Sequence, residues 1–433
     1  MNDPALAPPP PAPRMLASWQ EARAIIDQRS VDLLIAVQEI ARAEGIARRA
    51  LAAALPSLDA RGDVTHLIAG STTRTYPPSA TPAPGPEPLL PVSEDAPTSA
   101  SASITLRQPL IAPRAWYGIG TARLSVDVAK LSLEDRRRLT IGAVADAVVS
   151  IVTAERVSEV NRVGLRSALE RLELTRRRER LGTGTRLDVV RAEQDVALAR
   201  ATLVSGDESL RRTREALGAV LGERGEVGVP QSFSLNGIAA EMQSQCSQAR
   251  TDQRADVRAA RAELEIAERN LTDAKLAFAP YAELSSTLEG RTSIGDESYV
   301  RTRSWGWSIS AVLTVPIWDG GARYGDLRVN RAVIEQQRAR LGSVERTAEL
   351  DTAQATRAVS VAEQARAVAE QARDLARETA RLTQVAFEAG TATSFDLVES
   401  GRRQREAELD LAVREFEVVK AKITALLASA SCK

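Results

Sequence analysis

The sequence predicts a mainly helical chain with a small β part, and three observations support this fold class. Charged residues make up 26% of the 433 residues and aromatic residues only 3%, a composition typical of long helices and coiled coils. One pattern of glycine, threonine and aspartate occurs twice, which indicates a duplicated unit. Residues 304–315 alternate between a face carrying Trp305, Trp307 and Ile309 and a mostly small or polar face, which predicts a β-strand.

The duplicated unit is defined by matching segments that occur in the same order in both halves. The segment LGTGTRLDVV at 181–190 matches AGTATSFDLV at 389–398. Further upstream, Pro109, Tyr117 and Gly118 match Pro316, Tyr324 and Gly325, and Asp32 and Pro56 match Asp256 and Pro280. We therefore expect two copies of one structural unit, with an insertion between Pro56 and Pro109 in the first.

Each copy is expected to contain a helix, two strands, a very long helix, a turn and a returning helix. Repeat 1 covers residues 18–222, with helices at about 18–55, 118–180 and 186–222. Repeat 2 covers residues 254–428, with helices at about 254–279, 325–387 and 395–428. A short strand follows each closing proline, and Ile104, Leu106 and Leu110 mark a weaker return strand in the first copy. At 1.5 Å per residue, each long helix would measure roughly 95 Å.

Four segments lie outside these elements. Residues 1–17 form a proline-rich start that is expected to be flexible, and about 70–102 form a Pro/Ser/Ala loop that is expected to be disordered. Residues 223–253 link the two repeats, and we expect this linker to lie beside the C-terminus. Residues 429–433 are expected to form a C-terminal tail.

The second long helix carries a heptad pattern. Its members are Val361, Ala365, Val368, Ala372, Leu375, Thr379, Leu382 and Ala386. The alternating spacing of four and three fills the a and d positions of a left-handed coiled coil. We therefore expect this stripe to be a coiled-coil core rather than a ligand site.

The four predicted strands are too few to close a barrel, which usually needs about eight. Three copies would supply twelve strands and would remove the exposed edges, where outward tryptophans promote aggregation. Aromatic residues concentrate in or beside the strands, as in the girdles of outer-membrane barrels. The candidate membrane-interface residues are Tyr281, Tyr299, Trp305 and Trp307. The alternative is a soluble sheet with an aromatic core.

The composition excludes several classes of function. Lys plus Arg and Asp plus Glu both total 57, so we expect no binding of nucleic acid through bulk charge. The two cysteines form no CxxC pair, which excludes a disulfide framework and a cysteine zinc site, and His66 is the only histidine. No GxSxG, HExxH or Walker motif is present. We predict no enzymatic activity, no cofactor and no metal site.

The sequence leaves the route of export open. No apolar run reaches the roughly 18–20 residues of a membrane-spanning helix. The start MNDPALAPPPPAPRMLASW has prolines where a secretory signal would have an apolar stretch. Either the signal has been removed, or the true start lies upstream, or the protein is not exported.

Several segments resemble the TolC-like outer membrane efflux proteins. They are the duplicated unit, the strand end LTVPIWDGGARYGDLR at 313–328, the turn EAGTATSFDLVES at 388–400 and the opening SWQEARAIIDQRSVDLLIA at 18–36. The resemblance covers about residues 18–428. It implies long antiparallel hairpins forming a trimeric α-barrel in the periplasm, and a twelve-stranded transmembrane β-barrel in the Gram-negative outer membrane, with four strands from each chain.

The resemblance also implies partners and a role. The chain would be a homotrimeric duct surrounded by outer-membrane lipid, docked to a periplasmic adaptor and to an inner-membrane pump of the RND, ABC or MFS class. It would pass the substrates of an efflux or type I secretion system and carry no chemistry of its own. No cysteine lies near the start, so no lipid anchor is expected.

The two Gly-Thr turns are the candidate functional segments. Gly182 and Gly390 suit the left-handed conformation that follows a helix. A threonine after each glycine, Thr185 or Thr393, can cap the returning helix. By resemblance, the candidate contacts with the adaptor are Gly182, Thr183, Gly184, Thr185, Leu187, Gly390, Thr391, Ala392, Thr393 and Phe395.

Carboxylates near these turns form a candidate pore constriction. Asp188 and Asp396 stand in the first turn of each returning helix, where capping and the helix dipole alone would explain them. The functional alternative is that Asp396 and Glu399 of three chains ring a narrow mouth, bind cations and hold the entrance shut. The resemblance supports such a constriction, although Arg191 replaces Glu399 in the first repeat.

Two other classes of function fit part of the sequence. A soluble or periplasmic coiled-coil adaptor would need one hairpin interrupted by a β-rich lipoyl-like segment, whereas this chain has two hairpins. A cytoplasmic structural coiled coil explains the heptad but not the paired strands. The cargo, the pump class and the resting state of the entrance are not specified by the sequence.

Overall fold

The computed structural model describes residues 3–66, 68, 98–230, 246–248, 250–294 and 303–432. The chain forms two compact units. The first consists of Met1–Arg42, Asp127–Leu264 and Gln336–Lys433, and the second of Ala43–Val126 and Glu265–Glu335. Each unit therefore combines segments from both repeats.

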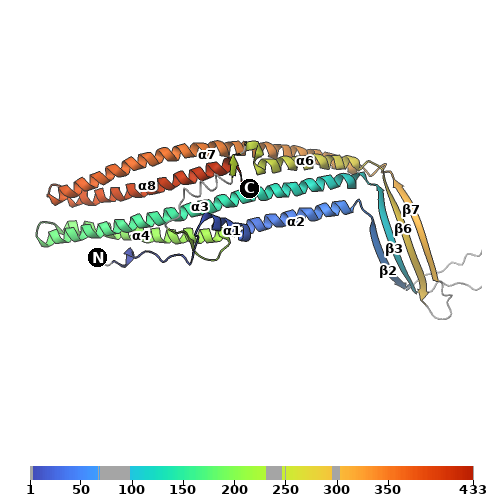
Figure 1. The fold of residues 1–433 in the computed structure, drawn as a ribbon, viewed down its shortest axis with the longest axis horizontal. Helices are drawn as coiled ribbons and strands as arrows, with labels where there is room; N and C mark the ends of the chain where they lie inside the picture. The colour runs from blue at the N-terminus through green and yellow to red at the C-terminus, as the bar shows by residue number, and fades with distance from the viewer. Residues whose placement is uncertain are drawn as a thin grey trace, which may run out of the picture. The chain divides into compact units, whose positions relative to one another are not determined.

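The structure confirms the duplication, because the same series of elements occurs twice along the chain (Figure 1). The first copy contains α1 (Trp19–Arg29), α2 (Val31–Ala52), β2 (Ser57–His66), β3 (Thr98–Ile111), α3 (Pro113–Arg180) and α4 (Arg186–Leu221). The second contains α6 (Ala255–Leu276), β6 (Tyr281–Ile294), β7 (Arg303–Thr314), α7 (Ala322–Glu388) and α8 (Ser394–Ser429). Short elements flank them: η1 (Pro4–Leu6), β1 (Arg14–Met15), β4 (Val227–Gly228), β5 (Cys246–Gln248), η2 (Thr251–Gln253) and β8 (Ala430–Cys432).

The first predicted helix, about 18–55, is divided at Ser30. This residue is extended (φ −62°, ψ 119°), so α1 ends there and α2 begins directly after it. The Ser30 N–H donates to the Ile26 carbonyl at 3.0 Å, and the Ser30 carbonyl accepts from the Leu34 N–H at 3.0 Å. One residue thus closes one helix and starts the next, a break that the continuous apolar pattern does not reveal.

Several segments predicted to be short or irregular are regular strands. β2 and β6 contain 10 and 14 residues, so the strands after Pro56 and Pro280 are not short. Residues 98–102 of the predicted loop belong to β3, while 70–97 lie outside the described residues. The predicted tail contains β8, which pairs with β5 of the linker. Residues 246–248 of the linker therefore lie beside residues 430–432 near the C-terminus.

The sequence predicts a flexible N-terminus, whereas the structure places residues 3–17 against α4 within the first unit. The Asp3 carboxylate accepts a hydrogen bond from Arg200 of α4 at 2.6 Å. Further along, Arg214 of α4 donates to the Pro10 carbonyl at 2.9 Å. These contacts satisfy polar groups that would otherwise favour solvent, and they explain why the segment is not a free tail.

The second unit contains an antiparallel sheet with the strand order β2-β3-β6-β7 (Figure 1). β3 and β6 pair at its centre, with Thr105 opposite Thr287, so the sheet joins the two repeats. β2 and β7 form its edges and expose large apolar side chains, among them Leu58 and Trp305. Edge strands of this kind favour pairing with further strands.

Apolar side chains from α1, α3, α4 and α8 form the core of the first unit. Ile26, Val148, Leu217 and Leu427 are among its buried members. A second, smaller cluster joins α3 and α4 nearer their turn and includes Leu165. Burial of these side chains holds the hairpins together, and the larger cluster also includes the ring of Trp19.

The predicted heptad stripe on α7 faces outward in the single chain, so its role as a coiled-coil core stays a prediction that depends on a second chain. Val368 and Leu375 are 66% and 71% exposed. The buried stripe lies at Ala355, Ala362 and Ala369 instead. Both stripes repeat every seven residues, and the spacing alone does not show which of the two packs inside the chain.

Candidate functional site

The two predicted turns end α3 and α7 with the same backbone geometry. Gly182 and Gly390 have φ values of 74° and 79°, in the left-handed region where a side chain would clash with the backbone. In the second turn the Thr391 N–H donates to the Ala386 carbonyl at 2.9 Å, and the first turn has the matching bond. The duplicated sequence pattern therefore produces two equivalent tips.

Capping boxes begin both returning helices, as the sequence predicts. Thr185 Oγ1 accepts from the Asp188 N–H at 3.3 Å, while Asp188 Oδ2 accepts from the Thr185 N–H at 3.0 Å. Thr393 and Asp396 repeat this exchange at 3.2 and 3.0 Å. Hydrogen bonds from the Thr393 side chain and backbone hold the pKa of the Asp396 carboxyl below its ordinary value.

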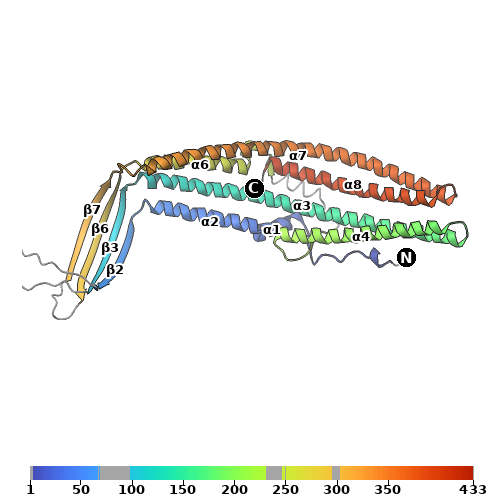
Figure 2. The ribbon, with the colours of Figure 1, turned by 180° about the vertical axis from the view of Figure 1, so that it is seen from behind.

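Direct contacts join the two tips, which lie side by side in both views of the ribbon (Figure 2). Arg178 of the first hairpin donates to the Phe387 carbonyl at 2.8 Å and lies 4.3 Å from the centre of its ring. The Ser394 hydroxyl donates to Asp188 Oδ1. Burial raises the pKa of Asp188, but the hydrogen bonds from Ser394 and Thr185 outweigh it and leave that pKa lowered. Asp188 is thus both a cap and a link between hairpins.

Glu399 is held within its own helix rather than left free. Arg402 and Arg403 each donate to Glu399 Oε1 at 2.8 Å. These hydrogen bonds, that from Arg402 first, lower the pKa of Glu399 from 4.5 to about 2. Because the pKa falls on folding, the ion pairs are complete above pH 4.5 and are lost as the pH falls toward 2. The two arginines offset one of the two carboxylates of the predicted ring.

A buried carboxylate that the sequence analysis did not select lies further along the hairpins. Asp195 of α4 is 5% exposed. It accepts hydrogen bonds from Arg171 of α3 at 2.8 Å and from Arg405 of α8 at 2.7 Å. Asp195 therefore connects three helices from both hairpins. Its sequence signal is its position in the apolar stripe of α4, one turn from Ala192 and Ala199.

Two helical glycines make room for these arginines. A Cβ built on Gly164 of α3 would lie 2.6 Å from Arg405 Cδ. A Cβ built on Gly401 of α8 would lie 3.1 Å from Arg171 Cζ. Each arginine thus crosses a glycine on the opposite helix to reach Asp195. We call Gly164, Arg171, Asp195, Gly401 and Arg405 the hairpin joint.

We expect Gly390→Ala to lower the free energy of unfolding by roughly 1–2 kcal/mol, because alanine is strained at a left-handed φ. Gly325→Ala in α7 is the matched control: its added Cβ meets open space at a helical position, where alanine is favoured over glycine by about 0.5–1 kcal/mol. Thermal unfolding followed by circular dichroism measures both changes. Equal shifts for the two variants would contradict the assigned role of the turn glycine.

The predicted interface aromatics lie on the strands and are exposed where the structure describes them. Trp305, Trp307 and Tyr281 all have more than half of their surface accessible, whereas Tyr299 lies outside the described residues. Trp305 and Trp307 share one face of β7 because successive strand residues alternate. Their contact with lipid stays a prediction.

Two further searches concern only the described residues. None of their helices combines the length and the apolar character that a membrane crossing requires. Within the same ranges, no three His, Cys, Asp or Glu side chains group closely enough to hold a metal ion.

Comparison with known proteins decides the family. The pattern of the family described as "Outer membrane efflux protein" matches residues 24–223 and 247–426, which follow the two repeats. The chain belongs to the outer membrane efflux protein family. This membership accounts for the duplicated hairpins and the four-stranded sheet together.

Individual relatives of this chain share less than 30% sequence identity with it. The fusaric acid resistance protein FusA of Burkholderia cepacia is 28% identical over 153 residues, covering 34% of this chain and 29% of the relative. Nodulation protein T of Rhizobium leguminosarum bv. trifolii is 25% identical over 317 residues, covering 69% of this chain and 63% of the relative. The matches thus span less than two thirds of either relative's length.

A solved structure supports the fold over nearly the whole chain. The outer membrane protein VceC from Vibrio cholerae superposes with a TM-score of 0.75 at 18% identity, covering 95% of this chain and 96% of that one. At this identity the similarity concerns the fold, so the roles of individual residues depend on the geometry described above.

Proposed function

We propose that this outer membrane efflux protein is the duct through which an efflux or type I secretion pump passes its substrates across the periplasm and the outer membrane. The observation that carries the proposal is the combination of two long helical hairpins with a sheet that exposes both edges. Hairpins repeated around an axis can line a tunnel, and strands with exposed edges can close into a barrel.

The working form is a homotrimer. Three copies of the four-stranded sheet supply twelve strands, enough for a closed barrel, and closure removes the exposed edges. An outward apolar stripe on α7 supports the same assembly and consists of Val361, Val368, Leu375 and Leu382. In aqueous solution an apolar stripe of this kind is normally buried against a partner. The tryptophans on β7 would then meet lipid at the membrane interface.

The hairpin tips would dock to a periplasmic adaptor, which in turn connects to an inner-membrane pump. Leu187 and Phe395 support this role because both expose apolar side chains beside the turns. Relatives named for fusaric acid resistance and for nodulation support export as the class of process. The role requires no catalytic group or cofactor.

Asp396 and Glu399 are proposed to narrow the entrance electrostatically. We expect Asp396→Ala combined with Glu399→Ala to raise single-channel conductance and to weaken block by divalent cations. Asp396→Asn is the control for the cap, because asparagine keeps the capping oxygen but removes the charge. Planar-bilayer recordings provide the measurement. Conductance and block that stay at wild-type values in the double variant would count against a carboxylate constriction.

The duct itself is tested by the same recordings on the unaltered protein. Purified trimers added to a planar lipid bilayer should produce discrete, long-lived conductance steps. A periplasmic adaptor or a structural coiled coil would produce none, so a silent bilayer with correctly folded trimers would reject the proposal.

A further inference from the structure

The two cysteines of the chain lie opposite each other in the backbone register at the ends of the second repeat. β5 and β8 pair in antiparallel orientation, and their register places Cys246 opposite Cys432. The family match to the second repeat covers residues 247–426, so the cysteines stand just outside its two ends. They are the only cysteines in the sequence.

We propose that Cys246 and Cys432 form a disulfide that closes the second repeat in the exported protein. Residues directly opposite each other in an antiparallel pair have Cα atoms about 4.5–5.5 Å apart. Disulfides join residues whose Cα atoms lie about 4.4–6.8 Å apart. The observed register therefore meets the backbone requirement for a bridge.

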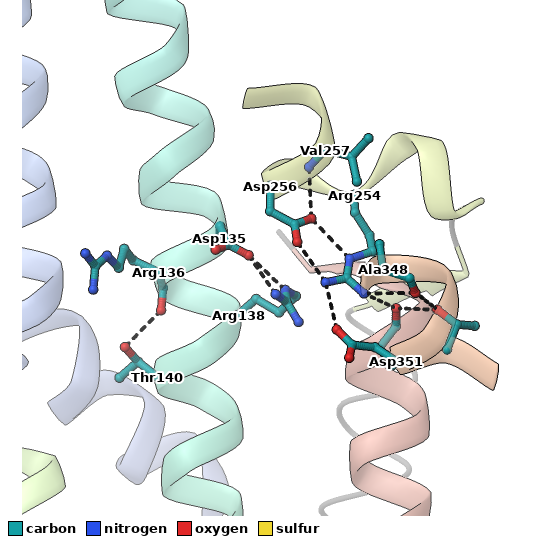
Figure 3. Close-up of polar contacts among 11 residues, drawn as sticks. Asp135, Arg136, Arg138, Thr140, Arg254, Asp256, Val257, Ala348 and Asp351 are labelled. Carbon is teal, nitrogen blue, oxygen red and sulfur yellow. Dashed lines mark hydrogen bonds and ion pairs between the residues drawn. The ribbon is translucent and has the colours of Figure 1, made fainter. Parts of the chain in front are cut away.

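Independent contacts hold the same two ends together (Figure 3). Arg254, which follows β5 and precedes α6, is 4% exposed. It donates to Asp256 at 2.8 Å and to the carbonyls of Ala348 and Ala428 at 3.5 and 3.4 Å. Asp351 of α7 lies 3.5 Å away on another side of the guanidinium. Ala428 is in the last turn of α8, directly before β8, and Arg254 lies shortly after β5. The contacts of Arg254 therefore hold the segments next to β5 and β8 together.

The first repeat is closed at the equivalent place by other means. β1 pairs with β4 in parallel orientation, with Arg14 opposite Val227. The Glu223 carboxylate accepts hydrogen bonds from both Arg14 and Arg29. Each repeat therefore has its two ends joined by a two-stranded sheet. In the second repeat, the cysteine pair occupies the place that the ion pairs of Glu223 with Arg14 and Arg29 occupy in the first.

The bridge needs an oxidising compartment, so this inference rests on the proposed export of the chain. Disulfides persist in the bacterial periplasm and are rare in the cytosol. Two thiol S–H bonds break and one S–S bond forms. The two hydrogens pass to the disulfide of an oxidant, either a thiol–disulfide exchange protein or glutathione disulfide, which is reduced to two thiols.

The first test uses the full-length protein purified from the outer membrane. Free thiols are blocked with N-ethylmaleimide in denaturant, and the peptides are analysed by mass spectrometry without reduction. We expect no labelling at either cysteine and one cross-linked peptide pair containing both, with full labelling after reduction. Complete labelling of both cysteines in this material would overturn the proposal, as would a bridge between two chains.

A second measurement separates failure of the bridge from failure of export. The purified, reduced, native protein is exposed to glutathione disulfide in detergent, and the same alkylation is repeated. Free thiols that persist there would overturn the bridge wherever the protein resides. A bridge that forms in detergent, together with free thiols in protein that cells retain in the soluble fraction instead of the outer membrane, would contradict export and thus the proposed function.

A register variant is the matched control. Cys432→Ser combined with Ser431→Cys moves the thiol by one residue, opposite Ser247 rather than Cys246. Neighbouring strand residues face opposite sides of the sheet. We expect the cross-linked peptide to be lost while the circular dichroism spectrum is unchanged. A bridge of undiminished yield in this variant would show that chain flexibility, and not the register, brings the cysteines together.

Discussion

Replacing Asp195 with alanine is expected to lower the free energy of unfolding by about 3–5 kcal/mol, because it leaves two largely buried guanidinium groups without their carboxylate. The side chains of Arg171 and Arg405 are only 16% and 17% exposed. Arg171 Nε and Arg405 Nη1 already have no acceptor in the described part of the chain. Nothing in the hairpin joint is therefore positioned to replace the lost charge.

Urea unfolding in detergent, followed by circular dichroism, measures this loss. Glu208→Ala is the matched control, because Glu208 is on the same helix and pairs with Arg212 at 3.0 Å on an exposed surface. Removing that pair should cost no more than about 0.5 kcal/mol. If the two variants unfold alike, the buried carboxylate does not hold the hairpins together as described.

Asp195→Ala should also loosen the second hairpin against the first, since its two arginines come from α3 and α8. In bilayer recordings we expect this variant to show a larger or noisier conductance. Asp195→Asn is the intermediate variant, because it keeps one acceptor for an arginine, removes the charge and replaces the second acceptor with an NH2 donor.

Introducing two glutamates on the outward stripe of α7, Val368→Glu with Leu375→Glu, is expected to abolish the trimer. Each side chain is mostly exposed in the single chain, so the fold of the protomer should not change. Burial of one such side chain at an interface stabilises the assembly by about 1.5–3 kcal/mol. Each of the three chains loses two of these side chains in the variant. Charges placed there would add a desolvation cost to that loss.

Native mass spectrometry or analytical ultracentrifugation in detergent follows this change. Ala367→Glu is the control, because it adds a glutamate at an exposed position on a different face of α7, one charge per chain against two in the double variant. We expect the control to remain trimeric. Trimers of the double variant with wild-type stability would place the subunit interface elsewhere on the chain.

Local chemistry made much of the fold predictable from sequence. The Gly-Thr turns and their caps are decided by residues within one turn of each other, and the structure contains both as predicted. The alternation through β7 likewise depends on neighbours two residues apart. The duplication helped, because a weak pattern seen twice in the same order is far less ambiguous than one seen once.

What the sequence did not reveal depends on partners distant in the chain. Asp195 gains its role from arginines on two other helices. The glycines that make room for these arginines have no local sequence pattern that distinguishes them from other helical glycines. The two stripes of α7 have equal periodicity, so only the position of α8 and α3 decides which is buried. Glu399 is a different case, because the arginines that bind its carboxylate stand at i+3 and i+4 on the same helix and could have been found in the sequence.

The most direct test of the central claim is the position of the protein on a sucrose density gradient of membranes from its native host. A duct of the outer membrane efflux family should band with the outer-membrane fraction and resist extraction by high salt. Recovery in the soluble fraction, or with the inner membrane, would contradict the account.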